Sequence, residues 1–175
     1  QIMEYCGEEF HGKKVTFVHQ EKQNGPAKAL WLCKELIKDR FILMFADDIH
    51  GKCDIARATS YSRSMLAITS EHPERFGVIV RNPDGTLYEM TEKPEHPQSN
   101  LVSTGPLVLD RQIFDYEPAA PINDEFFMPE ILERYSKDHP MAVVEQQLWI
   151  PVGYPEDIEK AERILKVIAN QAETV

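Results

Sequence analysis

Residues 41–51 read Phe-Ile-Leu-Met-Phe-Ala-Asp-Asp-Ile-His-Gly, an apolar run that ends in two adjacent carboxylates and a glycine. The run is typical of a buried strand, here residues 41–46, with Asp47 and Asp48 at its carboxyl end. In open α/β sheets, ligands bind outside the carboxyl ends of the strands. Carboxylate oxygens at such a place suit a divalent cation and the phosphates that it carries. The pattern therefore predicts phosphate chemistry at this end of the sheet.

The segments around this strand predict an α/β fold that opens with a β-α-β unit. Residues 15–20, Val-Thr-Phe-Val-His-Gln, have the composition of a short strand, and the apolar spacing of residues 27–38 predicts a helix. Such a unit favours parallel strands with the helix packed across one face. The remaining pattern predicts strands at residues 64–69, 76–81, 87–91, 101–110 and 141–145, and helices at residues 54–59, 125–137 and from Pro155 onward. One mixed domain over residues 1–175 is the prediction.

Composition excludes several classes of partner. The chain carries a formal net charge of -10, and phosphate backbones attract clustered Lys and Arg, so a nucleic-acid surface is disfavoured. No apolar run approaches the ~20 residues that cross a bilayer, and no signal peptide is visible at Gln1. Three cysteines without a CxxC pair fit neither a disulfide framework nor a zinc site. We therefore expect a cytoplasmic protein with no membrane and no nucleic-acid partner.

Four segments add a more specific pattern. They are Gln20 with Gly25-Pro-Ala-Lys-Ala-Leu30; Phe45-Ala-Asp-Asp-Ile49; Arg75-Phe-Gly-Val-Ile79 with Thr91-Glu-Lys-Pro94; and Ser99-Asn-Leu-Val-Ser-Thr-Gly105 with Trp149-Ile-Pro-Val-Gly-Tyr-Pro-Glu-Asp157. In this order they resemble the sugar-phosphate nucleotidyltransferase family, and the glucose 1-phosphate uridylyl- and thymidylyltransferases most closely. The resemblance implies a Rossmann-like three-layer nucleotide-diphospho-sugar transferase fold with a mixed sheet. It also implies that a nucleoside triphosphate, UTP or dTTP, reacts with a sugar 1-phosphate, glucose 1-phosphate, to give a nucleotide sugar and pyrophosphate.

The resemblance assigns a catalytic pair. Asp47 takes the position of the Mg²⁺ ligand, although Ala46 stands where the family's glycine is usual. Lys93 matches the lysine that meets the sugar phosphate, and Glu92 matches the glutamate that accepts hydrogen bonds from sugar hydroxyls. A cation that bridges the α-phosphate would withdraw charge from the phosphorus under attack. The alternatives are a solvated turn or a helix N-cap for Asp47 and Asp48, and a solvated hairpin end for Glu92 and Lys93.

Five further positions follow from the same resemblance. Gly77 matches a glycine where the backbone approaches the sugar, since any side chain would occupy substrate space; an ordinary strand glycine is the alternative. Gln20 and Gly25 align with positions that read the nucleobase, but proline follows Gly25 where threonine or leucine is usual, which leaves the base open. Asn100 and Thr104 lie in the segment that lines the sugar pocket, with ordinary strand and turn hydrogen bonding as the alternative.

Two departures from the family pattern limit the expected activity. Relatives place an aspartate two residues after the tryptophan of the last segment, where it completes the metal site, and this chain has Pro151 there. The family's opening strand and its glycine-rich loop, which grip the triphosphate, do not precede Val15. We therefore expect a truncated, partial nucleotidyltransferase domain that keeps the sugar-phosphate side of the site and is inactive in transfer on its own.

Other interpretations remain open at this point. A degenerate sugar-phosphate-binding or assembly module would use the strand edge left uncovered beside residues 15–20 to pair with another copy as a homo-oligomer. A metal-dependent glycosyltransferase would use Asp47 and Asp48, but that class has no need of Glu92-Lys93-Pro94. A haloacid-type phosphatase requires a second aspartate where this chain has Ile49.

Overall fold

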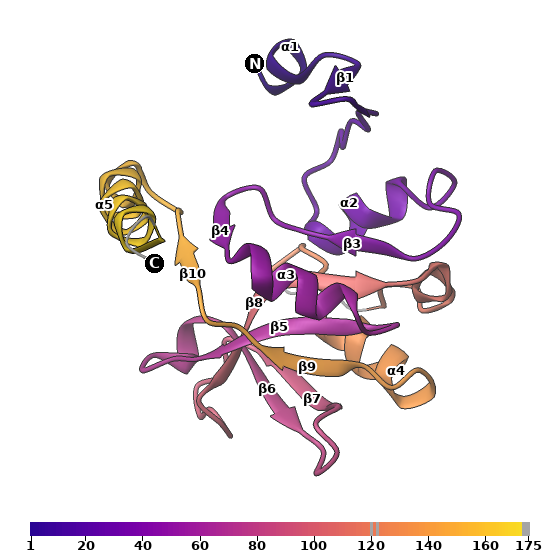
Figure 1. Ribbon diagram of the computed structural model, residues 1–175. Helices are drawn as coiled ribbons and strands as arrows, with labels where there is room; N and C mark the ends of the chain where they lie inside the picture. Colours follow the sequence, from indigo (N-terminus) through magenta and orange to yellow (C-terminus); the bar gives the residue numbers. More distant parts are fainter. Residues whose placement is uncertain (120, 122, 173–175) are drawn as a thin grey trace.

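A computed structural model describes residues 1–119, 121 and 123–172 of the chain. Its centre is a six-stranded sheet in which the strand order is β7-β6-β8-β5-β9, with β3 paired to β8 (Figure 1). The strands of this sheet are β3 (Phe41–Leu43), β5 (Ser64–Thr69), β6 (Gly77–Arg81), β7 (Leu87–Glu92), β8 (Leu101–Leu109) and β9 (Ala142–Glu145). The sheet is mixed, because β5 and β9 are parallel and the other pairs are antiparallel.

The middle of the sheet is built on β8, which pairs with β3, β5 and β6. Its burial is nearly continuous, and the alternation of its side chains sends Leu107 and Leu109 to one face and Val108 to the other. On β5, Met65 joins the first face and Leu66 the second. A strand that is apolar on both sides needs cover on both faces.

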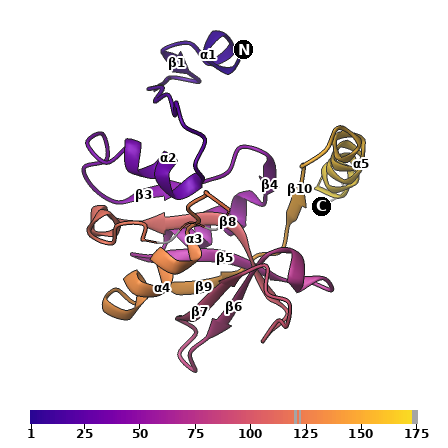
Figure 2. The same cartoon turned by 180° about the vertical axis from the view of Figure 1, so that it is seen from behind.

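Helices supply that cover. On one face lie α2 (Pro26–Leu32) and α4 (Pro129–Asp138), and the buried Leu30 and Tyr135 belong to the same apolar cluster as Leu107. On the other face lies α3 (Lys52–Thr59), whose buried Ala58 packs with Leu66 and Val108. Figure 1 shows α3 in front of the sheet, and Figure 2, from behind, shows α4 on the opposite side.

The predicted strand at residues 15–20 is wrong, and with it the opening β-α-β unit. The chain starts with α1 (Ile2–Cys6) and a hairpin of two-residue strands, β1 (Glu9–Phe10) and β2 (Lys13–Lys14), and then runs without regular structure to α2. Strand propensity reflects packing against neighbours, and here Phe17 and Val18 are exposed, with no strand of the described residues paired to them. The parallel pairing expected for residues 41–46 also fails, since β3 is antiparallel to β8.

Several boundaries differ from those predicted. The first long helix ends at Leu32 and not at residue 38, and β3 ends at Leu43 and not at residue 46. The predicted helix of residues 125–137 begins only at Pro129, because the backbone of Phe126 is used to pair with the segment before α2: its N–H donates to the Asn24 carbonyl (2.9 Å) and its carbonyl accepts from Ala27 N–H (3.0 Å).

The predictions from residue 52 onward are otherwise confirmed in kind and place. They include α3, β5, the β6–β7 hairpin, β8, β9 and the last helix, α5 (Pro155–Ala172). A second small sheet was not foreseen: β4 (Asp48–His50) pairs antiparallel with β10 (Trp149–Pro151). Within the described ranges, no helix has the length and apolar character needed to cross a bilayer.

Candidate active site

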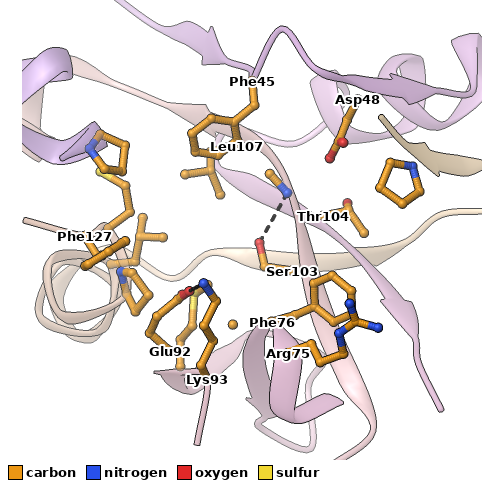
Figure 3. Close-up of a pocket in the computed structure, with 18 of the residues that line it drawn as sticks. Phe45, Asp48, Arg75, Phe76, Glu92, Lys93, Ser103, Thr104, Leu107 and Phe127 are labelled. Carbon is orange, nitrogen blue, oxygen red and sulfur yellow. Dashed lines mark hydrogen bonds and ion pairs between the residues drawn. The ribbon is translucent and has the colours of Figure 1, made fainter. Parts of the chain in front are cut away.

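A cavity of about 420 Å³ opens where the end of the β6–β7 hairpin, the middle of β8, the start of α4 and the β4–β10 pair meet. Figure 3 shows its wall, with Glu92, Lys93 and Arg75 on one side and Phe45 and Asp48 across from them. The lining includes both residues of the predicted catalytic pair, Asp47 and Lys93. Segments that are far apart in the sequence thus converge on one concave surface.

The acidic side of the cavity is the turn between β3 and β4. Asp47 is exposed in this turn, and its backbone carbonyl accepts a hydrogen bond from Val152 N–H (3.0 Å). The register of β4 with β10 sets Pro151 opposite Asp48. In the part of the chain that the structure describes, nothing donates a hydrogen bond to the Asp47 carboxylate or forms an ion pair with it. Asp47 is therefore the carboxylate of this turn that is open to a ligand.

Asp48 has a different environment. The indole Nε1 of Trp149 donates a hydrogen bond to its Oδ2 (2.8 Å), and the Trp149 ring meets Phe76 edge to face, with ring centroids 5.2 Å apart and an interplanar angle of 71°. The N-cap of the following helix is Gly51, so the N-cap interpretation of Asp48 is wrong. Asp48 is therefore connected to Phe76, the residue before Gly77, through the hydrogen bond from Trp149 and the packing of the Trp149 ring on Phe76.

A buried aspartate that the sequence reading missed holds this arrangement in place. Asp54 is only 2% exposed, and its Oδ2 accepts from the backbone N–H of Gln147 (3.1 Å) and Leu148 (3.0 Å), while its Oδ1 accepts from Arg57 (2.6 Å). Burial alone would raise the pKa of Asp54, but these hydrogen bonds, led by that from Arg57, outweigh it and lower the pKa. A Cβ on Gly51 would lie 2.5 Å from Asp54 Oδ2, which explains the glycine.

The opposite side of the cavity is the open end of the β6–β7 hairpin. Gly77 faces Glu92 in register, and a Cβ on Gly77 would lie 2.6 Å from Met90 Cε and 3.3 Å from Glu92 Oε2. The side-chain amine of Lys93 lies 3.9 Å from Glu92 Oε1. The backbone N–H of Lys93 donates a hydrogen bond to the Phe76 carbonyl (3.0 Å). Burial raises the pKa of Glu92, and the charge of Lys93 offsets this only in part.

Lys93 also has an unusual backbone. Its φ of 42° lies in the left-handed region, which costs a residue with a side chain about 1 to 3 kcal/mol. Backbone strain of this kind is concentrated at functional sites. The hairpin end therefore carries a cation, a half-buried carboxylate and local strain in two consecutive residues.

The predicted site residues divide into two groups. Those that line the cavity are Asp47, Gly77, Glu92, Lys93 and Thr104. Thr104 is 2% exposed and its hydroxyl donates to the Leu66 carbonyl (3.2 Å), so this hydroxyl is engaged in joining β8 to β5.

Gln20, Gly25 and Asn100 do not line the cavity. Gln20 Nε2 donates to the Gly25 carbonyl (3.2 Å), and a Cβ on Gly25 would lie 2.5 Å from backbone atoms of Phe126, so this glycine is required for packing. Asn100 is exposed, and its carbonyl accepts from Ser70 N–H (2.8 Å). The structure therefore gives local reasons for these residues, and their ligand contacts remain predictions.

Further residues of the wall were missed by the sequence reading. Arg75, Phe45, Ser103 and Gly105 all line the cavity. Gly105 has a φ of 106°, and a Cβ there would lie 2.7 Å from the Phe45 ring, so the glycine lets this ring lie against β8. A glycine inside an apolar strand was the signal that could have indicated a close approach.

The donor set fits Mg²⁺ bound partly by a ligand. In the described ranges, no three His, Cys, Asp or Glu side chains gather into a metal-binding group. Mg²⁺ is often held by one or two carboxylates together with substrate phosphates and water. Asp47, with the second oxygen of Asp48, meets that requirement, whereas Pro151 adds no ligand.

Comparisons with known proteins agree with one another. The nucleotidyl transferase family model matches residues 2–167. The UTP–glucose-1-phosphate uridylyltransferase AglF of Haloferax volcanii is 31% identical, over 98% of this chain and 75% of its own length. The bifunctional protein GlmU of Methanocaldococcus jannaschii is 27% identical over 87% of this chain, which spans 38% of that longer protein.

A solved structure shares the fold. A Bacillus anthracis protein described as a glucose-1-phosphate thymidylyltransferase, crystallised with sucrose, matches with a TM-score of 0.78. The match covers 93% of this chain and 70% of that one, at 24% sequence identity.

Proposed function

This chain belongs to the nucleotidyl transferase family, and we propose that it serves the reaction of a nucleoside triphosphate with a sugar 1-phosphate, which yields a nucleotide sugar and pyrophosphate. The substrates that we propose are UTP or dTTP and glucose 1-phosphate. The observation that carries the proposal is that Asp47 and Lys93, from segments 46 positions apart, line one cavity. We extend the proposal to a Rossmann-like, three-layer fold, supported by helices on both faces of the mixed sheet.

The two sides of the cavity have separate roles in this proposal. Lys93 binds the phosphate of the sugar 1-phosphate, Glu92 accepts hydrogen bonds from sugar hydroxyls, and Gly77 lines the cavity where the sugar ring would lie. Across the cavity, Asp47 would hold Mg²⁺, which when bound neutralises phosphate charge. The attacking phosphate oxygen is already ionised at neutral pH, so the protein needs no general base. Its contribution is to position two anions that repel each other.

The two residues predicted to bind the nucleobase, Gln20 and Gly25, lie outside the cavity lining. We propose that Gln20 and Gly25 read the base from the rim beside Pro26, which does line the cavity. Uridine is favoured because the AglF protein of Haloferax volcanii is a UTP-dependent uridylyltransferase by name. Asn100, which directly precedes β8, and Thr104, which lies within it, would act on the sugar side.

We further propose that these 175 residues bind the sugar 1-phosphate but catalyse the transfer reaction slowly by themselves. The reason is that most residues of the cavity wall belong to the part of the site that would bind the sugar phosphate. Calorimetric titration with glucose 1-phosphate tests binding, and pyrophosphate release with UTP or dTTP tests transfer. Lys93→Ala should weaken binding about 10-fold or more, since a charge-assisted hydrogen bond is lost. The matched control is Lys166→Ala on α5, which should bind like wild type.

The two outcomes that oppose this proposal are distinct. Wild-type protein that shows no saturable binding of glucose 1-phosphate would refute the sugar-phosphate site. Rapid pyrophosphate release would instead refute the statement that the chain is slow by itself.

A second candidate function is an assembly module, and the open edge of β3 favours it. In the described residues, β3 pairs only with β8; the exposed Ile42 lies in β3, and the exposed Met44 follows it directly. An uncovered edge with apolar side chains invites pairing with another copy of the chain. Multi-angle light scattering tests this candidate, and a clean monomer at micromolar concentration would count against it. The three free cysteines support a reducing, cytoplasmic setting in either case.

A further inference from the structure

Arg75 differs from the other arginines of the chain. Each of the others has a partner in the structure: carboxylates for Arg57, Arg63, Arg81, Arg134 and Arg163, and backbone carbonyls for Arg40 and Arg111. Among the residues that the structure describes, no hydrogen bond or ion pair holds the guanidinium of Arg75. This guanidinium belongs to a residue that lines the cavity. An arginine without an internal partner at a concave surface is available to a ligand.

The backbone fixes where Arg75 stands. It ends a short 3₁₀ helix, η1 (Pro73–Arg75), which is closed by hydrogen bonds from Arg75 N–H to the His72 carbonyl (3.2 Å) and from Phe76 N–H to the Pro73 carbonyl (3.0 Å). Phe76 is extended, with φ of -134° and ψ of 175°, so Arg75 and Gly77 lie on the same side of the chain. That is the side on which Gly77 approaches Glu92.

Arg75 and Lys93 are brought to the same wall of the cavity. Gly77 pairs with Glu92, and Phe76 receives the hydrogen bond of Lys93 N–H, so the two cations flank the open end of one hairpin. Figure 3 shows both side chains on the wall that faces Asp48. The anchored turn keeps the Arg75 backbone in place, while its side chain makes no hydrogen bond or ion pair with the residues that the structure describes.

The charges of the wall distinguish the two cations. The Lys93 amine lies 3.9 Å from Glu92, so part of its charge is already balanced, whereas Arg75 has no such carboxylate in the described residues. The guanidinium is a planar fork that can donate two parallel hydrogen bonds to a phosphate, which an ammonium group cannot.

We propose that Arg75 is a second phosphate-binding residue of this cavity and that, together with Lys93, it makes the site select phosphorylated over unphosphorylated sugar. The proposal rests on the proposed function, since it assigns a further residue to the same sugar 1-phosphate. It adds that Arg75 touches the phosphate and not the sugar ring. It also accounts for the lack of an ion pair at Arg75 among the residues that the structure describes, although Glu74 precedes it in the sequence.

The test compares Arg75→Gln, Arg75→Lys and wild type in calorimetric titrations with glucose 1-phosphate, and measures competition by inorganic phosphate. Arg163→Gln on α5 is the matched control, because it removes one exposed arginine outside the cavity.

We expect Arg75→Gln to bind glucose 1-phosphate about 10-fold to about 100-fold more weakly, the range for a lost hydrogen bond to a charged group. Inorganic phosphate should lose potency by a similar factor, and Arg75→Lys should fall between Arg75→Gln and wild type. The control should match wild type, and the unfolding temperature should stay unchanged in all variants.

Three results would overturn the inference. If wild type binds glucose 1-phosphate and Arg75→Gln binds it equally well, Arg75 does not contact the ligand and the proposed function stands without it. If Arg75→Gln weakens glucose 1-phosphate binding but not competition by inorganic phosphate, Arg75 contacts the sugar instead. If wild type binds neither compound, the proposed function fails and takes the inference with it.

Discussion

Trp149 and Asp48 are joined by a 2.8 Å hydrogen bond from the indole Nε1 to Oδ2, although 101 positions separate them in the chain. The bond is made possible by the pairing of β10 with β4. It gives the two neighbouring aspartates different environments, because the Asp48 carboxylate accepts a hydrogen bond from the protein, whereas the Asp47 carboxylate accepts none from the described residues. We therefore expect Asp48 to act mainly by holding Trp149 against Phe76.

Replacing Asp48 tests this role directly. In a Trp31→Phe background, Trp149 is the sole tryptophan and reports on its own surroundings. Asp48→Asn keeps an oxygen that can accept the indole N–H, so its fluorescence maximum and stability should stay close to the parent protein. Asp48→Ala should shift the maximum and lower the free energy of unfolding by about 1.5 kcal/mol. Equal spectra for all three proteins would show that the hydrogen bond has no role.

Lys93 offers a test that separates backbone strain from binding. Lys93→Gly and Lys93→Ala both remove the amine, so both should lose glucose 1-phosphate binding to the same extent. Only glycine adopts the φ of 42° without strain, so Lys93→Gly should be more stable than Lys93→Ala by about 1 kcal/mol. Urea denaturation measures the difference, and an alanine variant as stable as the glycine variant would contradict it.

Glu92 should make stability depend on pH in a defined direction. Its pKa in the folded protein is raised above the ordinary value of 4.5, mainly by burial. The stability associated with the protonated form is therefore complete below pH 4.5 and is lost as the pH rises through the folded-state pKa. Glu92→Gln removes this loss, so its unfolding temperature should exceed that of wild type by a margin that grows from pH 4 to pH 7. A margin that is constant with pH would contradict the burial effect.

Asp54 should show the opposite pH dependence. Hydrogen bonds lower its folded-state pKa below the ordinary value of 3.8, so the stability that they provide is present above that pH and is lost as the pH falls. Asp54→Ala leaves the N–H groups of Gln147 and Leu148 without their acceptor and should lower the free energy of unfolding at pH 7 by about 2 kcal/mol. Thermal unfolding at pH 7 and pH 3 measures both effects, and the gap between the two proteins should shrink at pH 3.

Pro151 allows the metal prediction to be tested by adding a ligand. Position 151 lies opposite Asp48 in the β4–β10 pair and lines the cavity. Pro151→Asp should lower stability without metal, since it adds a third carboxylate to this side, and should increase the rise in unfolding temperature caused by Mg²⁺. Pro151→Asn is the uncharged control and should respond to Mg²⁺ like wild type. If Mg²⁺ stabilises the aspartate and asparagine variants equally, the acidic turn is not a metal site.

The sequence predicted best what depends on neighbouring residues. The β6–β7 hairpin was recognised because the Asn82-Pro-Asp-Gly85 turn and its flanking apolar strands lie within one short segment. The strand at residues 15–20 was wrong because propensity alone cannot supply the neighbouring strand that a sheet requires. The comparisons confirm the family resemblance. Asp47, Gly77, Glu92 and Lys93, which were assigned from that resemblance, line one cavity, although their individual roles remain predictions.

The contacts that the sequence could not predict join distant segments. The acceptor role of Asp54 toward Leu148 spans 94 positions, and nothing in the local pattern around either residue indicates it. The same holds for Gly25, whose glycine is required by the backbone of Phe126 and not by a ligand. Nothing local in the sequence marks Arg75, because a single arginine before an aromatic residue has no periodicity; what sets it apart is that no described residue pairs with its side chain.

The attachment of the β6–β7 hairpin has a mechanical consequence. Its two strands pair along their length with one register shift, between Val80 and Arg81, whereas β6 pairs with β8 only at Val78 and Val102 among the described residues, and β7 is the outermost strand of the order. The turn end of the hairpin is tied to β9 and the residue before it: Leu87 N–H donates to the Met141 carbonyl (2.8 Å), Val143 N–H donates to the Gly85 carbonyl (3.0 Å), and Arg81 pairs with Glu145 (2.7 Å). A tilt that carried Lys93 away from Asp47 would break these contacts, so the hairpin favours an entrance of constant width.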